Sequence, residues 1–289
     1  MQKVMFKGTI NVNGQLLDLS IPKLMGIVNL TPDSFFEGSR AQTDMQVAER
    51  VRLLLTEGAD ILDVGAYSSR PGADDLPVEE EMRRLREGLS VLRKEAPGAI
   101  VSVDTFRADV AKMCIEEYGV AIINDISGGK LDSNMFSTVA RAHVPYIIMH
   151  MQGTPQNMQQ APHYEDVLKD VMLHLADKVR ILQELKVNDI ILDPGFGFGK
   201  TQAHNFELLA HLNEFDIFQL PLLVGVSRKS MIYKTLDITP AEALNGTTVL
   251  HTIALSKGAN ILRVHDVKEA VEAIKLWQNV KKYEFNQDN

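Results

Sequence analysis

The stretch LMGIVNLTPDSF, residues 24–35, contains a short apolar run that ends directly in polar residues. A run of about five such residues is too short for a helix and suits a strand that is buried on both faces of a parallel sheet. A doubly wound open sheet, the main alternative, would be expected to carry a glycine fingerprint directly after its first strand. Asn29, Leu30 and Thr31 follow instead. The stretch therefore favours a different parallel-sheet fold.

Seven further runs of the same kind follow, and sequence with helical periodicity separates each from the next. The eight predicted strands begin at residues 24, 61, 100, 121, 146, 189, 221 and 260. Apolar strands that alternate with amphipathic helices indicate a parallel sheet covered on both faces. Open doubly wound sheets usually have fewer strands, whereas eight strand–helix units close into a barrel. We therefore expect an α/β protein with a (β/α)8 TIM barrel.

A short hairpin is predicted to precede the barrel, within residues 1–20. Lys3–Val12 and Gln15–Leu19 flank Asn13-Gly14, a dipeptide that readily adopts the positive φ angles of a two-residue hairpin turn. No low-complexity linker or shift in composition divides the rest of the chain. We therefore expect a single domain over residues 1–289, with a disordered polar tail at 285–289.

The sequence also predicts where the first two helices of the barrel begin. Thr43 and Gln46 form a capping-box pattern before the first helix, which should stop at Gly58. Pro77 precedes the second helix, and Glu79–Glu81 then lie at its positive end. We expect these three glutamates to form a solvated first turn.

The composition excludes several kinds of partner. A net charge of -8 and a pI near 5.5 argue against a nucleic-acid or anionic membrane surface, which would need a basic face. The single Cys114 cannot form an intrachain disulfide and is expected to lie in a helix, where it packs as a small apolar residue. The first residues do not resemble a signal sequence, and no run reaches the roughly 18 apolar residues of a spanning helix. We expect a cytoplasmic protein.

Polar residues close all eight predicted strands, at the mouth where TIM barrels carry their active sites. In chain order they are Asn29, Asp63, Asp104, Asn124 with Asp125, His150, Asp193, Ser227 with Arg228 and Lys229, and Arg263 with His265. Asp, Asn and Ser are also common helix caps, so any one of them could be structural. Arg and Lys are poor N-caps, however, and they occur only at the last two strand ends. The pattern predicts a site that separates charge, with phosphate bound at these two ends.

The stretch DPGFGFGK, residues 193–200, suggests a phosphate-binding loop by composition alone. Pro194 stands where such a loop needs a glycine five residues before Gly199, so the spacing excludes it. His150 opens HMQGTP, where it serves either as a ligand contact or as a turn residue. The histidines show no metal-ligand spacing, so zinc is not expected. Magnesium needs fewer protein ligands, and Asn29 alone could hold it beside a substrate phosphate.

Eight motifs together resemble those of the dihydropteroate synthases, pterin-binding enzymes of folate biosynthesis. They are MGIVNLTPDSF (25–35), DVGAYSSRPGA (63–73), SVDT (102–105), INDISGG (123–129), HMQGTP (150–155), DPGFGFGK (193–200), GVSRKS (225–230) and RVHDV (263–267). They stand in the family's order from the first predicted strand to the eighth. Where the family often has Gly-Glu-Ser-Thr-Arg, this chain has Ala66-Tyr67-Ser68-Ser69-Arg70. Ser69 keeps the hydroxyl group, so its hydrogen bonding should survive.

The resemblance implies a transferase that condenses 6-hydroxymethyl-7,8-dihydropterin diphosphate with 4-aminobenzoate. The products are 7,8-dihydropteroate and diphosphate, formed by an SN1-like displacement. It also implies Mg²⁺ bound by Asn29, a homodimer and a sulfonamide target. The loops at 30–42 and 66–76 are expected to be mobile and to close over bound diphosphate.

For the pterin, the resemblance implies a paired, charge-assisted contact between Asp193 and the amino-pyrimidine edge. Asn124 and Lys229 complete the contacts of the ring, and Asp104 lies on its other side. Asp63 is also assigned to substrate binding. The glycines of 193–200 would let their loop pass close to the flat ring.

For the other groups, Arg263 and His265 are expected to donate to the diphosphate. The resemblance assigns the aminobenzoate ring to Ser69, Arg70, Pro71 and Phe198, although Phe198 could also fill the core. The aminobenzoate carboxylate would meet Lys229 or a helix beginning at Ser230. Asp104, Lys229 and Arg263 are the predicted catalytic residues, with Asp104 stabilising the cation that forms when diphosphate leaves.

Two other functions fit part of the pattern. A pterin-binding methyltransferase barrel would share the recognition of the pterin by a carboxylate and an Asn, but would not need Arg263-Val264-His265 or the SSRPG loop. A non-enzymatic pterin-binding subunit would be expected to lose some of the charged strand ends. All of them are present in this chain.

Overall fold

The structure, a computed structural model, describes residues 8–31, 40–68 and 75–284. The strands in these ranges are β1 (Thr9–Val12), β2 (Gln15–Asp18), β3 (Lys23–Asn29), β4 (Ile61–Gly65), β5 (Ile100–Asp104), β6 (Ile122–Asp125), β7 (Tyr146–Met149), β8 (Ile190–Asp193), β9 (Leu223–Val224) and β10 (Ile261–Val264). The helices are α1 (Arg40–Glu57), α2 (Val78–Glu95), α3 (Ala108–Tyr118), α4 (Met135–Ala142), α5 (Val167–Glu184), α6 (Gln202–Ala210), α7 (Ser230–Leu236), α8 (Leu244–Ser256) and α9 (Val267–Glu284), with 3-10 turns at Leu212–Phe218 and Pro240–Glu242. The predicted tail at 285–289 lies outside the described residues.

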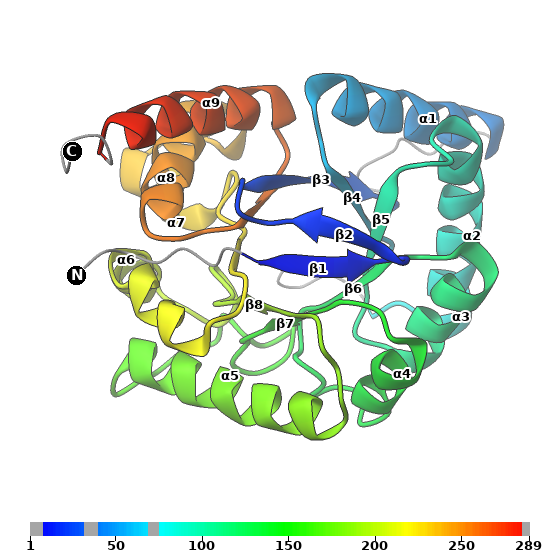
Figure 1. Cartoon of the computed structure of the whole chain (residues 1–289), viewed down its shortest axis with the longest axis horizontal. Helices are drawn as coiled ribbons and strands as arrows, with labels where there is room; N and C mark the ends of the chain where they lie inside the picture. Colours follow the sequence, from blue (N-terminus) through cyan, green and yellow to red (C-terminus); the bar gives the residue numbers. More distant parts are fainter. Residues whose placement is uncertain (1–7, 32–39, 69–74, 285–289) are drawn as a thin grey trace.

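Strands β3 to β10 form one parallel sheet, in the order β8, β7, β6, β5, β4, β3, β10, β9. A parallel bridge between Leu192 of β8 and Leu222, next to β9, joins the two edge strands and closes the sheet. The helices surround this ring (Figure 1). The predicted (β/α)8 TIM barrel is confirmed.

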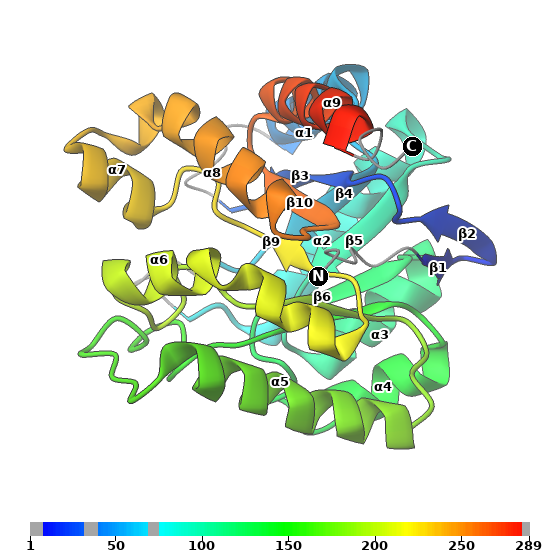
Figure 2. The same ribbon diagram turned by 60° about the vertical axis from the view of Figure 1, so that its left-hand side comes forward.

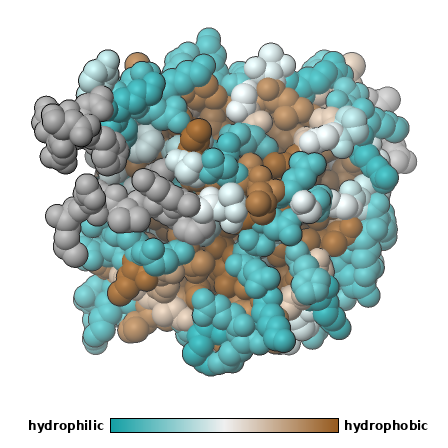
Figure 3. Space-filling view, viewed as in Figure 1, coloured by the Kyte–Doolittle hydropathy of each residue, from teal (hydrophilic) through white to brown (hydrophobic). Residues whose placement is uncertain are grey.

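The hairpin β1–β2 covers the end of the barrel at which the parallel strands begin (Figures 1 and 2). Asn13 and Gly14 form its turn with φ angles of 50° and 81°, as the sequence predicts. Ile10 and Val12 pack in one apolar cluster with Ile61 and Ile261, the first residues of β4 and β10. Figure 3 shows this face, with hydrophilic and hydrophobic residues interspersed. Because the hairpin closes one end, ligands are left with the opposite mouth.

Alternation along the strands decides which side chains reach the barrel interior. In β4, Ile61 belongs to the interior cluster, whereas Leu62 and Val64 pack with the helices. Asp63 therefore points inward, and the same alternation turns Asp104, Asn124, Asp193 and Arg263 inward in their own strands. It turns two other strand-end residues, Asp125 and His150, toward the helices.

Two predictions about helix starts were wrong. Helix α1 already begins at Arg40, so Thr43 lies within the helix and not before it, although the helix does end before Gly58, which has a φ angle of 104°. Glu81 is fully buried and not solvated. It lies one helical turn before Leu85, on the face of α2 that packs against the sheet. The charge can be buried there because Thr105 and Arg107 donate hydrogen bonds to its two oxygens. Cys114 is buried in α3, as predicted.

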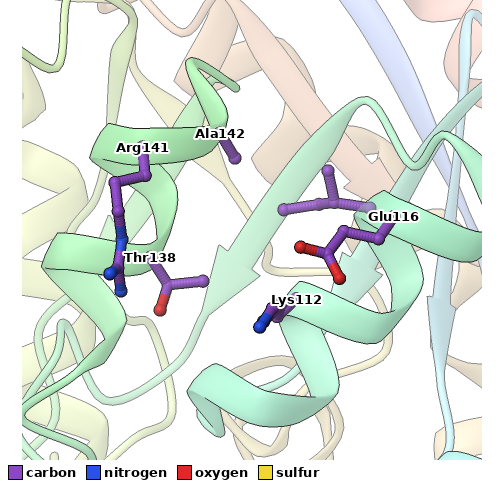
Figure 4. A pocket seen from close by; sticks show the side chains of 6 residues that line it. Lys112, Glu116, Thr138, Arg141 and Ala142 are labelled. Atoms are coloured by element: carbon purple, nitrogen blue, oxygen red, sulfur yellow. The ribbon is translucent and has the colours of Figure 1, made fainter.

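A hollow of about 320 Å³ lies between α3 and α4 (Figure 4). Lys112 and Glu116 of α3 face Thr138 and Arg141 of α4 across it. None of the residues that line it was assigned to the site from sequence. Among the described helices, none combines the length and apolar character needed to span a membrane.

Candidate active site

One arginine connects the carboxylates in the centre of the barrel mouth. Arg263 of β10 donates through Nε to Asp63 Oδ2 of β4 at 2.7 Å and through Nη2 to Asp104 Oδ2 of β5 at 2.9 Å. Asn124 of β6 donates to the same oxygen of Asp63 at 3.1 Å. The strands thus bring together four residues that are far apart in sequence, as predicted for the site.

The second oxygen of Asp63 stands out because it has no partner among the described residues. Asp63 is fully buried, and its Oδ1 accepts no hydrogen bond there. A buried carboxylate oxygen without a donor is costly, since the group has lost water without replacing it. Asp63 Oδ1 is therefore suited to receive an N–H or O–H group of a ligand.

The burial of these charges shifts their protonation equilibria. Burial raises the pKa of Asp104 to about 7, against the opposing effect of Arg263 and with the support of the negative charge of Asp63. Burial also lowers the pKa of Lys229 to about 8, although Asp193 favours its protonated form. Both groups therefore titrate close to neutral pH, which is a common property of catalytic residues.

Asp193 and Lys229 form a second group at the mouth. Asp193 Oδ1 accepts the backbone N–H of Gly195 at 2.7 Å, and burial raises the pKa of this carboxyl. Lys229 donates to the carbonyl of Phe196, and its Nζ lies 4.6 Å from the ring centre of Phe198. Phe198 is half-buried and packs beside a cluster that includes Met149 at the end of β7. Its ring is thus in position to form one wall of a binding site.

Two glycines of DPGFGFGK are required by the packing of their loop. A Cβ atom on Gly195 would lie 2.0 Å from the carbonyl oxygen of His150, and one on Gly199 would lie 2.7 Å from that of Gln152. Both glycines have positive φ angles, of 73° and 61°. They are therefore needed because this loop packs closely against the one after β7, and the predicted approach of the loop to a flat ring stays a prediction.

Lys200, for which no role was predicted, holds the same two loops together. Its buried Nζ donates to the carbonyl oxygens of His150, Gly195 and Phe198 at 3.2, 2.9 and 3.1 Å, and lies 2.9 Å from His150 Nδ1. His150 also packs edge-on against His174 of α5. Burial and the charge of Lys200 lower the pKa of His150 to about 2, so the ring is neutral. Of the two roles open to His150, the structure favours the structural one.

The residues at the ends of β9 and β10 separate into two groups. Ser227 Oγ lies 3.0 Å from His265 Nδ1 and accepts the backbone N–H of His265 at 3.2 Å. Burial and the nearby Arg263 lower the pKa of His265 to about 4, so it is neutral at pH 7. Arg228 is directed away from the others and pairs with Asp266 at 2.8 Å. It is therefore not one of the cations of the site.

Comparison with known proteins identifies the family. Residues 25–265 match the family described as pterin binding enzymes. The dihydropteroate synthase of Escherichia coli strain K12 is 42% identical over 265 residues, which cover 91% of this chain and 93% of that protein. The chain belongs to the dihydropteroate synthase family.

Solved structures of dihydropteroate synthases agree with this assignment. The enzyme from Yersinia pestis, in a sulfonamide drug complex, has a TM-score of 0.85 and 39% identity, over 95% of this chain and 99% of that one. The enzyme from Xanthomonas albilineans with 4-aminobenzoic acid has a TM-score of 0.88 and 37% identity, over 95% and 98% of the two chains. These values over nearly the whole chain extend the match from motifs to the complete fold.

Several residues that the dihydropteroate synthase motifs assign to the site can now be placed. Asn29 ends β3 beside Gly65, and Ser230 is the first residue of α7. Asp125 points away from the mouth, where the Tyr146 hydroxyl donates to it at 2.6 Å. Ser69, Arg70 and Pro71 lie outside the described residues, as do most of the residues predicted to form mobile loops at 30–42 and 66–76.

Proposed function

We propose that this member of the dihydropteroate synthase family is a transferase that joins 4-aminobenzoate to the methylene carbon of 6-hydroxymethyl-7,8-dihydropterin diphosphate. The observation that carries this proposal is the contact of Arg263 with both Asp63 and Asp104 at the mouth. This contact supports the proposal because a cation suited to the leaving group lies next to carboxylates suited to the developing positive charge. Family membership supports the same reaction.

The pterin ring would bind between the two groups of carboxylates. Its amino-pyrimidine edge has adjacent N–H donors, and Asp193 offers a buried carboxylate that can accept two of them. Asp63 Oδ1 offers a further buried acceptor. Lys229 and Asn124 would complete the polar contacts. The ring would thereby satisfy groups that are costly to leave buried without ligands.

The diphosphate would be held by Arg263 and His265. Nη1 of Arg263 makes no hydrogen bond within the described ranges and can donate to a phosphate oxygen. Because Ser227 Oγ accepts a backbone N–H, its own hydrogen can be donated to His265 Nδ1. The neutral imidazole would then carry its proton on Nε2, directed to the diphosphate.

The reaction would proceed by dissociation and capture. The bond between the methylene carbon and the diphosphate oxygen breaks, the electron pair leaves with the diphosphate, and the carbon becomes positively charged. Asp104 stabilises that charge, an interaction that is strongest in the transition state. The amine of 4-aminobenzoate then forms the new C–N bond and releases a proton. It needs no general base, since an aromatic amine is already unprotonated at neutral pH.

Asn29 is our proposal for the protein ligand of Mg²⁺. Among the described residues, no three His, Cys, Asp or Glu side chains are grouped as a metal site. Arg263 already occupies Asp63 Oδ2 and Asp104 Oδ2. A single amide oxygen fits magnesium, which often takes most of its ligands from water and substrate phosphates. When bound, the ion would supply positive charge to the leaving diphosphate.

We further infer a homodimer that forms through α8 and α9. Val249 and Ile253 lie one turn apart on α8 and are exposed, as are Leu276, Val280 and Tyr283 on α9. An exposed apolar surface on neighbouring helices is typical of a subunit interface. The cytoplasmic location and the inhibition by sulfonamides stay predictions, the latter supported by the sulfonamide complex of the Yersinia pestis relative.

The decisive experiment is an assay of the purified protein with the pterin diphosphate, 4-aminobenzoate and Mg²⁺. We expect dihydropteroate and one equivalent of diphosphate. A pterin-binding methyltransferase would instead consume a methylated folate, so that substrate provides the control. If no dihydropteroate forms although calorimetry shows that both substrates bind, the proposed function is wrong.

A further inference from the structure

Glu81 of α2 is a buried carboxylate with two loop residues as partners. Thr105 Oγ1 donates to its Oε1 at 2.7 Å, and Arg107 Nη1 donates to its Oε2 at 2.6 Å. Burial raises the pKa of Glu81, while these two partners oppose that shift. Thr105 directly follows Asp104, and both partners belong to the connection between β5 and α3. Glu81 thus connects α2 with the loop next to the catalytic carboxylate.

Arg107 extends these contacts to the connection between β4 and α2. Its Nη2 lies 3.3 Å from Asp75 Oδ1, and the Tyr67 hydroxyl donates to the same oxygen at 3.0 Å. Gln156, after β7, donates to the Tyr67 hydroxyl at 2.6 Å. The guanidinium of Arg107 also lies 5.3 Å from the centre of the Tyr67 ring, a distance that allows a cation–π interaction. Residues from three loops of the mouth are therefore linked through Arg107 and Tyr67.

Of the two residues that Arg107 contacts, Tyr67 follows β4 and Asp75 precedes α2. Tyr67 packs beside the same apolar cluster as Phe198, the expected wall for the aminobenzoate ring. Arg107, which is held by Glu81, therefore contacts both Asp75 and the aromatic ring that packs beside this cluster.

We propose that Glu81 and Arg107 are positioning residues for 4-aminobenzoate, which fix Tyr67 and Asp75 relative to each other and to Phe198. The proposal rests on the proposed function, since it concerns the second substrate of that reaction. Among the described residues, neither of them is hydrogen-bonded to Asp193, Lys229 or Arg263, which are proposed to bind the pterin diphosphate. Their loss should therefore affect the two substrates unequally.

The test compares two Glu→Gln substitutions, one in α2 and the other in α3. Glu81→Gln keeps an acceptor for Thr105 but removes the charge that holds Arg107. The control, Glu117→Gln, breaks the exposed ion pair of Arg86 of α2 with Glu117 of α3, at 2.7 Å. We expect Glu81→Gln to raise the KM for 4-aminobenzoate by about tenfold or more, with the KM for the pterin diphosphate within about twofold of the original. Glu117→Gln should change neither.

A double variant tests whether Glu81 acts through Arg107. Because the two residues belong to one network, Glu81→Gln with Arg107→Gln should raise the KM for 4-aminobenzoate no more than the larger single effect. Equal increases of both KM values in Glu81→Gln would overturn the proposal. So would a lower melting temperature with both KM values unchanged, since that indicates a role in stability only.

A measurement that does not require turnover separates this proposal from the proposed function. Amide hydrogen exchange in the peptide that spans 102–110 should become faster in Glu81→Gln and stay unchanged in Glu117→Gln, because Glu81 holds Thr105 and Arg107 of that segment. Unchanged exchange in Glu81→Gln would contradict the positioning role even if the enzyme is active. Absence of dihydropteroate with the unaltered protein would contradict the proposed function, whatever the exchange shows.

Discussion

Arg263 and Asp104 form an ion pair across the barrel mouth, with Nη2 and Oδ2 2.9 Å apart, although 158 residues separate them in the chain, from 105 to 262. The side chain of Arg263 extends past β3, which lies between β10 and β4, to reach the carboxylates. In this pair each charged group has the other as its partner. If diphosphate engages Arg263 as we propose, Asp104 would become more available to a cation on the pterin. Binding of the leaving group and stabilisation of the cation would then be connected.

Replacing Asp104 by Asn should slow the chemical step more than it weakens binding. The amide keeps the size of the side chain but removes the negative charge that the transition state needs. We expect kcat to fall by about 10²- to 10³-fold, as for the loss of one preorganised electrostatic contact, with both KM values within a few-fold. Steady-state kinetics with both substrates varied tests this. A large rise of KM at unchanged kcat would instead make Asp104 a binding residue.

The pH dependence of kcat/KM should follow Asp104 and Lys229. The pKa of Asp104 is raised to about 7, so its carboxylate, and with it the rate, increases as the pH rises through 7. The pKa of Lys229 is lowered to about 8, so its ammonium group, and its contact with substrate, is lost as the pH rises through 8. A bell-shaped profile is expected. In Asp104→Asn the acidic limb should disappear while the basic limb stays, and an unchanged acidic limb would argue against Asp104.

Asp193→Asn tests recognition of the pterin ring. Asn can still accept the backbone N–H of Gly195, so the loop should keep its shape. It cannot offer two acceptor oxygens to the amino-pyrimidine edge, and its own N–H group would face the donors of the ring. The loss should be about 2 to 5 kcal/mol of binding free energy, as for a broken buried charged contact. Calorimetric titration with the pterin measures this, and unchanged affinity would reject the assignment.

The barrel could be predicted from sequence because eight short apolar runs indicate eight buried strands. The strand-end residues were harder to sort, since the predictions treated Asn124 with Asp125, and His150, as one set around the mouth. Strand alternation separates them: Asn124 faces the interior, whereas Asp125 and His150 pack toward the helices. The sequence did not carry that signal, because isoleucine occupies both faces of β6 and β7: Ile123 and Ile148 pack toward the helices, whereas Ile122 and Ile147 pack in the interior.

Contacts between distant loops could not be predicted in the same way. Glu81 occupies a helical first turn, where acidic residues are usually exposed, and only its spacing from Leu85 indicated the buried face. Its partners Thr105 and Arg107 come from another loop, and no local pattern reports such pairing. The role of Lys200 could not be predicted for a related reason. It follows a glycine-rich run that suggests phosphate binding. Its acceptors are backbone carbonyl groups, and because every residue has one, no sequence pattern indicates them.

Lys200→Met should therefore destabilise the fold of the mouth. Met fills a similar volume, but it leaves the carbonyl oxygens of His150, Gly195 and Phe198 without their shared donor in a buried position. We expect a loss of about 2 to 5 kcal/mol in the free energy of unfolding, measured by urea denaturation. The matched control is Lys257→Met, since Lys257 donates to the carbonyl of Ala210 in an exposed setting. That control should cost less than about 1 kcal/mol. Equal losses in the two variants would show that burial of Lys200 adds nothing, and that the two loops are held together by their glycine contacts alone.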